Sequence, residues 1–166
     1  MAIVVMVTAL IAAIMQADRI GLQTAAHREI TEDTDPQDTG CDDGSIRTVT
    51  KSDVYGPHRL LLGEVRLRYS PECRAAWARF DAAPVMERLP GAEVSIQLTR
   101  PSDGKRLRYE TPYLGLFVYG NMLRADKGCL RVKGSVSAPR PQKGSLSVLP
   151  EGTLTGSGTT RCALPE

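Results

Sequence analysis

The residues of this 166-residue chain that could carry chemistry are four cysteines, two histidines and a few carboxylates. Four cysteines can pair as disulfides in three ways, and the rival use of such residues is a metal site. Zinc sites usually show Cys-x-x-Cys pairs or histidines at short spacing, and neither pattern occurs here. The sequence therefore predicts no metal and no cofactor, and it predicts disulfides among Cys41, Cys73, Cys129 and Cys162.

Groups for acid–base or nucleophilic catalysis are sparse. A Ser-His-acid triad would have to use His58, which follows Gly56-Pro57 in a predicted loop, because His27 lies in a predicted linker. No nucleophile elbow, phosphate loop or metalloprotease helix is present. Carboxylates that could act in pairs on a glycosidic bond lie on or beside predicted strands: Glu64, Glu93, Asp103 and Glu110. The sequence places no two of them at the required separation, so we predict no catalytic residue and no enzyme.

Arginines form a candidate anion-contacting patch. Arg66 and Arg68 share the exposed face of a predicted strand, and Arg74 and Arg79 follow nearby. From Arg47 onward the chain has 19 basic and 11 acidic side chains, a balance that attracts polyanions. Because an apolar N-terminus predicts export, the expected partners are anionic envelope polymers or lipid headgroups and not nucleic acid. The alternative is that these arginines are ordinary solvated side chains on the outer face of a strand and bind no ligand.

The first 15 residues, Met1 to Met15, are uncharged and apolar apart from Thr8. Residues 2–15 as a helix would cover about 21 Å, less than the roughly 30 Å of a hydrocarbon core. That length favours a signal peptide, and Thr24-Ala25-Ala26 offers a small-residue cleavage pattern. No Lys or Arg precedes the run, so the end of a longer transmembrane helix is the alternative. Residues 1–26 are predicted to be a signal peptide or membrane anchor, with the body outside the cytoplasm.

The rest of the chain divides into a linker and a β domain. Residues 27–45 contain seven acidic side chains, Pro36 and Gly40, and predict a solvated acidic linker. Period-two alternation within residues 46–166 predicts strands at Leu60–Tyr69, Ala92–Arg100, Arg106–Glu110 and Leu114–Tyr119, the last broken at Gly120-Asn121. Turn residues predict hairpins through Pro101–Gly104 and through Asp126–Gly128, which is flanked by Met122–Ala125 and Cys129–Val136. The tail, Gly144–Ala163, fits strand or coil. We predict an all-β, mainly antiparallel sandwich or barrel.

One segment favours a helix instead. Ser70-Pro71-Glu72 has the hydroxyl, proline and acid of a helix start. Apolar residues then follow at helical spacing: Cys73, Ala76, Trp77 and Phe80. We predict one short helical turn that leads into extended chain, the alternative being a turn at Pro71–Arg74 that feeds a strand. In both cases Trp77 is expected in the core.

The segment Glu64–Arg79 resembles the hallmark of the YjfA-like family, domains of unknown function that are secreted or tethered behind a transmembrane helix in actinobacteria and bacilli. Further segments resemble the family pattern: Asp35-Pro36, Gly40-Cys41, Thr48-Val49, Thr111-Pro112 and Val118-Tyr119. The chain lacks the extra cysteine often found before the Asp-Pro pair, and the two cysteines common ahead of the Thr-Pro segment. The resemblance implies a Cys41–Cys73 disulfide, which leaves Cys129 with Cys162. It implies no activity. We therefore predict a non-catalytic binding or structural module that is secreted or anchored at the membrane. The alternatives are a secreted hydrolase acting on cell-wall material and the extracytoplasmic part of a membrane sensor.

Overall fold

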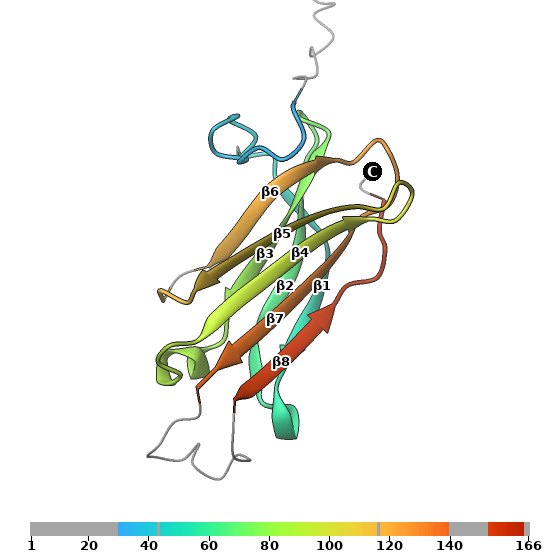
Figure 1. Ribbon diagram of the computed structural model, residues 1–166. Coiled ribbons are helices and arrows are strands. Elements are labelled where there is room, and N and C mark those ends of the chain that lie inside the picture. Colours follow the sequence, from blue (N-terminus) through green and yellow to red (C-terminus); the bar gives the residue numbers. More distant parts are fainter. Residues whose placement is uncertain (1–29, 43, 116, 140–152, 165–166) are drawn as a thin grey trace, which may run out of the picture.

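The computed structural model describes residues 30–42, 44–115, 117–139 and 153–164. Within these ranges eight antiparallel strands form one sheet that curls almost into a closed barrel (Figure 1). The strands are β1 (Arg47–Tyr55), β2 (Leu61–Ser70), β3 (Ala75–Ala82), β4 (Glu93–Arg100), β5 (Lys105–Pro112), β6 (Val118–Arg124), β7 (Arg131–Ala138) and β8 (Leu154–Thr159). Two short 3-10 turns, η1 (Pro57–Arg59) and η2 (Pro84–Arg88), lie in the connections. The predicted all-β, antiparallel, barrel-like fold is confirmed.

The core fills the inside of the curled sheet. Strand order is β5-β4-β7-β8-β1-β2-β3-β6, so the two edge strands, β5 and β6, face each other without forming a ladder. Side chains of one alternating phase of each strand point inward and are buried, as period-two geometry requires. Large members of this core are Val54, Leu62, Val65, Leu67, Phe80, Val94, Ile96, Leu98, Leu123, Val132 and Val136. The other phase forms the outer face of the barrel.

The strands and hairpin predicted most directly are present. Val65, Leu67 and Tyr69 lie on the buried face of β2, as their alternation predicts. Strands β4 and β5 form the predicted hairpin through residues 101–104, with Gly104 in the left-handed region at φ 72°. These elements are local, so their pattern is visible in the sequence.

The segment after Ser70 is a turn and not a helix. Residues 71–74 connect β2 to β3, and Arg74 has φ 47°, which no helical turn allows. Strand β3 begins at Ala75 and pairs with β2 along its whole length, and this ladder overrides the helix-start signature. Trp77 is buried as expected.

Strand β6 differs from the prediction at both ends. Residues 114, 115 and 117 of the predicted strand lie outside it. It continues through Gly120-Asn121, where an irregularity in its pairing with β3 absorbs the extra residue. The predicted hairpin around Asp126–Gly128 is wrong, because β7 pairs with β4 and β8 while β6 pairs with β3. The sequence analysis also missed β1, and the tail contributes β8.

Residues 30–42, predicted as part of a solvated linker, lie against the barrel. Ile30 and Cys41 are buried in a second apolar cluster with Cys73, Trp77 and Met122, on the outer face of β3 and β6. The disulfide and Ile30 give this acidic segment enough apolar contact to dock. The predicted signal peptide or anchor, residues 1–26, lies outside the described residues. Within the described ranges, no helix is long and apolar enough to span a membrane.

Candidate functional site

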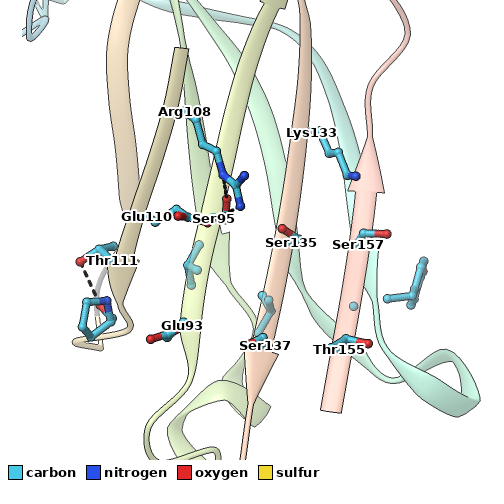
Figure 2. A pocket seen from close by; sticks show the side chains of 15 residues that line it. Glu93, Ser95, Arg108, Glu110, Thr111, Lys133, Ser135, Ser137, Thr155 and Ser157 are labelled. Atoms are coloured by element: carbon cyan, nitrogen blue, oxygen red, sulfur yellow. Dashed lines mark hydrogen bonds and ion pairs between the residues drawn. The ribbon is translucent and has the colours of Figure 1, made fainter. Parts of the chain in front are cut away.

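The strongest candidate site is a groove of about 660 Å³ on the outer face of β5, β4, β7 and β8 (Figure 2). We call it the outer-face groove. It is lined by Tyr55, Glu93, Val94, Ser95, Arg108, Glu110, Thr111, Pro112, Lys133, Ser135, Val136, Ser137, Thr155, Gly156 and Ser157. These residues come together because strand pairing aligns the outward phase of four neighbouring strands.

Hydroxyl side chains line the middle of the outer-face groove. Ser135 on β7 is the pairing partner of both Ser95 on β4 and Ser157 on β8. Figure 2 shows these three serines in a line across the sheet, with Ser137 and Thr155 in the next row. Each hydroxyl can both donate and accept a hydrogen bond, so the floor suits a ligand rich in hydroxyl groups.

Cations stand at one end of the outer-face groove, where Arg108 and Lys133 line it, and just beyond that end, where Arg106 and Arg131 lie one row further along the strands. Arg106 and Arg131 both flank Thr99 on β4, and Arg108 and Lys133 both flank Gln97. Strand spacing puts the backbones of Arg106 and Arg131 about 10 Å apart, and those of Arg131 and Lys133 about 7 Å apart. The Arg108 side chain is engaged, because it pairs with Glu110 and its Nε donates to Ser95 Oγ at 3.2 Å.

The other three cations are free. Arg106, Arg131 and Lys133 are exposed, and their side chains make no hydrogen bond or ion pair with any described residue. We call these three residues the basic row. The sequence analysis missed it because its members lie on two strands that are far apart in sequence. The sequence did hold a signal for it, because basic and apolar side chains alternate in two predicted strands. These stretches are Arg106-Leu107-Arg108 and Arg131-Val132-Lys133.

The predicted arginine patch has a different character. Arg66 and Arg79 are cross-strand partners on β2 and β3, next to the pair Glu64 and Asp81. Asp81 accepts from Arg79 at 2.8 Å and lies 3.1 Å from Arg66 Nε. Glu64 binds both Arg66 and Lys51. The side chains of Lys51, Glu64, Arg66, Arg79 and Asp81 therefore form an ion-pair ladder in which charge is largely balanced.

Arg68 and Arg74 complete the predicted patch. Burial, together with the nearby charges of Arg79 and Arg66, lowers the pKa of Arg68, whose Nη1 donates to Thr48 Oγ1 at 2.7 Å. Arg74 lies in the turn between β2 and β3, outside the ladder. The structure thus brings Arg66, Arg68 and Arg79 together on one face and leaves Arg74 at the hairpin end.

A family model described as "Protein of unknown function (DUF2690)" matches residues 31–131. The chain belongs to this family. The DUF2690 match runs from the docked N-terminal segment through β6 to the first residue of β7, and it leaves β8 and Cys162 outside. Comparison with curated proteins found no match, and comparison with solved structures found none.

The candidate catalytic groups of this DUF2690 domain are dispersed. His58 is exposed in η1, with φ 53° and no hydrogen bond to a described residue. Glu64 belongs to the ion-pair ladder, and hydrogen bonds from Arg100 lower the pKa of Asp103. Only Glu93 and Glu110 line the same groove.

Both disulfides of the DUF2690 protein have the pairing that the resemblance implied. Cys41 pairs with Cys73, with a Cα–Cα distance of 5.9 Å, and Cys129 pairs with Cys162, at 5.5 Å. Two such bonds indicate an oxidising, extracytoplasmic environment. In the described part of the chain, no three His, Cys, Asp or Glu side chains cluster so as to hold a metal ion.

Proposed function

We propose that this DUF2690 protein is a non-catalytic binding module outside the cytoplasm, whose outer-face groove holds an anionic, hydroxyl-rich polymer of the cell envelope. The observation that carries the proposal is the basic row, three unpaired cations beside a floor of serine and threonine hydroxyls. An unpaired cation can be neutralised by a ligand without first breaking an internal ion pair. The ion-pair ladder at Arg66 and Arg79 lacks that advantage.

The shape of the site favours a chain over a small molecule. Hydroxyls from three strands lie across the sheet, and the free cations stand about 7 to 10 Å apart at one end. A polymer that repeats an anionic group along a polyol or sugar backbone would meet both features at once. Its charges would contact the basic row while its hydroxyls exchanged hydrogen bonds with Ser135, Ser157 and Thr155.

The two disulfides, the apolar run within residues 1–26 and the resemblance to YjfA-like domains support a secreted or membrane-anchored protein. In that location the anionic partners at hand are wall polymers and lipid headgroups, and nucleic acid is not an expected ligand. Membrane attachment, if the N-terminal segment is retained, would keep the outer-face groove near such polymers.

A hydrolase that uses Glu93 and Glu110 is the second candidate, because both carboxylates line one groove from adjacent strands. Against it, the Glu110 carboxylate is already paired with the Arg108 guanidinium, so one of the two groups is engaged within the protein itself. Release of reducing ends from wall glycans by the wild type, but not by Glu93→Gln, would favour the hydrolase.

Titration with purified wall teichoic acid tests the binding module. The double variant Arg131→Gln/Lys133→Gln should bind at least tenfold more weakly than the wild type. The matched control, Arg74→Gln/Arg88→Gln, removes the same charge from exposed positions outside the groove and should change affinity less than twofold. If both double variants lost affinity equally, the effect would come from the net charge of the protein and not from the basic row. Binding to phosphatidylglycerol vesicles but not to teichoic acid would identify lipid headgroups, and not a wall polymer, as the ligand.

A further inference from the structure

A second groove lies along the seam where the edge strands β5 and β6 face each other (Figure 1). We call it the seam groove. It has a volume of about 280 Å³ and is lined by Asp35, Tyr109, Thr111, Pro112, Leu114, Phe117, Val118, Tyr119 and Asn121. The two strands touch beside it, because a Cβ atom on Gly120 would lie 3.4 Å from Tyr109 Cβ. Since the seam is closed there, the seam groove suits a ligand group of small size and not an extended chain.

The seam groove gathers exposed apolar side chains. Among the large apolar side chains that the described structure exposes, three line it: Tyr109 at 47%, Leu114 at 83% and Phe117 at 44%. The ring of Phe117 lies 6.0 Å from that of Tyr119, centroid to centroid, with the two planes tilted by 31°. A concentration of exposed apolar groups at one place is typical of an interaction site, and a ligand with methyl or methylene groups would cover it.

The charge of the seam groove is negative. Asp35 is the one charged side chain among the residues that line it. Asp35 Oδ1 accepts from the Gln37 N–H at 2.7 Å, which holds the carboxylate in place. Burial and nearby carboxylates, that of Asp35 first among them, raise the pKa of the Tyr119 hydroxyl. A ligand that complements this charge is a cation.

An aromatic ring of the seam groove already binds a cation of the protein itself. Arg79 Cζ lies 4.0 Å from the centroid of the Phe117 ring, within the range of a cation–π contact. Arg79 is held by the Asp81 carboxylate at 2.8 Å and is not among the residues that line the groove. Asp35 forms no ion pair with any described residue, so its charge is available to a ligand.

The walls of the seam groove distinguish between kinds of cation. A primary ammonium or a guanidinium carries several N–H donors, and each needs an acceptor when water is removed. A quaternary ammonium has no such donor, and aromatic faces recognise it through their electron-rich π systems. Its methyl groups can pack against apolar side chains such as Leu114 and Val118. Aromatic rings, apolar side chains and a single carboxylate therefore match a quaternary ammonium best.

We propose that the seam groove is a binding site for a quaternary ammonium group, the cationic end of a choline-type molecule. The rings of Tyr109, Phe117 and Tyr119 contact its methyl groups, and the Asp35 carboxylate balances its charge. The rest of the molecule leaves the groove toward solvent. This site goes beyond the polymer-binding role proposed above and does not depend on it.

Nuclear magnetic resonance titration of the protein, with both disulfides intact, tests the proposal. The probe is choline chloride at constant ionic strength. The matched ligand is 3,3-dimethylbutan-1-ol, the neutral isostere in which carbon replaces the nitrogen atom. Choline should shift the amide signals of Thr111, Tyr119 and Asn121 and should bind at least tenfold more tightly than the isostere. Ethanolamine, the primary ammonium of the same chain length, should bind at least fivefold more weakly than choline.

Variants at the seam groove provide the second readout. Tyr109→Leu keeps an apolar side chain but removes the aromatic face, and Asp35→Asn keeps the acceptor that the Gln37 N–H uses but removes the charge. Each should weaken choline binding at least fivefold while the amide spectrum stays that of a folded protein. The matched controls Leu61→Ala and Glu72→Gln, at exposed positions outside the groove, should change it less than twofold.

Three outcomes would overturn the proposal. The first is the absence of saturable shifts up to about 100 mM choline. The second is equal binding of choline and its neutral isostere, which would make the groove a plain apolar pocket. The third is unchanged choline binding by both Tyr109→Leu and Asp35→Asn. If choline binds as expected, cosedimentation with phosphatidylcholine vesicles would identify a lipid headgroup as the source of the ammonium group, and binding of free choline alone would identify a soluble ligand.

Discussion

Glu32 and Arg100 form a buried ion pair that fastens the N-terminal segment to the barrel. Arg100 is 1% exposed, and its guanidinium binds Glu32, the Asp103 carboxylate and the Arg124 carbonyl, the last at 2.9 Å. Glu32 also accepts from Lys105 Nζ at 2.6 Å. The hydrogen bonds from Arg100, together with those from Lys105 and the Arg124 N–H, lower the pKa of Glu32 from 4.5 to about 2 despite its burial.

This ion pair predicts acid sensitivity. Because the pKa of Glu32 is lower in the folded state than its ordinary value, its stabilisation is complete above pH 4.5 and is lost as the pH falls toward about 2. A depression of that size corresponds to about 3 kcal/mol of unfolding free energy. Glu32→Gln should therefore cost about 2 to 3 kcal/mol at pH 7 and progressively less below pH 4.5.

Urea denaturation followed by the fluorescence of buried Trp77, repeated between pH 7 and pH 2.5, measures this effect. Glu87→Gln removes an exposed carboxylate and serves as the control, which should follow the wild type at every pH. A constant difference between the wild type and Glu32→Gln across that range would contradict the assignment.

A close approach across the core predicts a second large effect. A Cβ atom on Gly134 of β7 would lie 2.0 Å from Val65 Cγ1 of β2 and 3.4 Å from Val54 Cγ2 of β1. Gly134→Ala should destabilise the domain by about 1 to 3 kcal/mol, because Val65 is fully buried and has little room to move. Gly44→Ala is the control, since nothing lies within 4 Å of the added atom, and it should stay within about 0.5 kcal/mol. Equal unfolding midpoints for the two variants would show that the core adjusts freely.

Local patterns in the sequence predicted the fold class and several strands. The alternation of Val65, Leu67 and Tyr69 and the turn before Gly104 depend only on neighbouring residues, and both predictions were confirmed. Arg100 had a readable signal that was missed. It continues the inward phase of Val94, Ile96 and Leu98, so a buried and paired arginine was the consistent interpretation.

Pairing between strands that are far apart in the sequence explains the features that the sequence analysis did not predict. The turn at Asp126–Gly128 has hairpin composition, yet β7 finds its partners in β4 and β8. The basic row likewise depends on β4 lying between Arg106 and Arg131, which no local pattern specifies. Arg66 and Arg68 of β2 looked free because Asp81, which pairs with Arg66, and Thr48, which accepts from Arg68, lie on the two neighbouring strands.

Accessibility predicts the order in which the disulfides are reduced. The two bonds close loops of nearly equal length, with sequence separations of 32 and 33, so chain entropy alone gives each about 3 to 4 kcal/mol. Cys41 and Cys73 are buried beside Trp77, whereas Cys162 is exposed. A thiolate must reach a sulfur atom to attack it, so dithiothreitol should open Cys129–Cys162 first under native conditions.

Timed alkylation and mass spectrometry of the native protein measure that order. Labelling at Cys129 and Cys162 should precede labelling at Cys41 and Cys73 by at least tenfold in time. Simultaneous labelling of all four would mean that reduction follows global unfolding, and earlier labelling of Cys41 would contradict the docking of the N-terminal segment.

Ionic strength separates the basic row from the ion-pair ladder as the site of anion binding. Each unpaired cation that contacts a polyanion releases condensed counterions, so the slope of log affinity against log salt should fall by roughly one for each such cation removed. Arg131→Gln and Lys133→Gln should each reduce the slope of teichoic acid binding. Arg66→Gln should leave the slope unchanged and instead lower the unfolding midpoint, because Glu64 and Asp81 lose a partner. The reverse pattern, a reduced slope for Arg66→Gln alone, would move the anion site to β2 and β3.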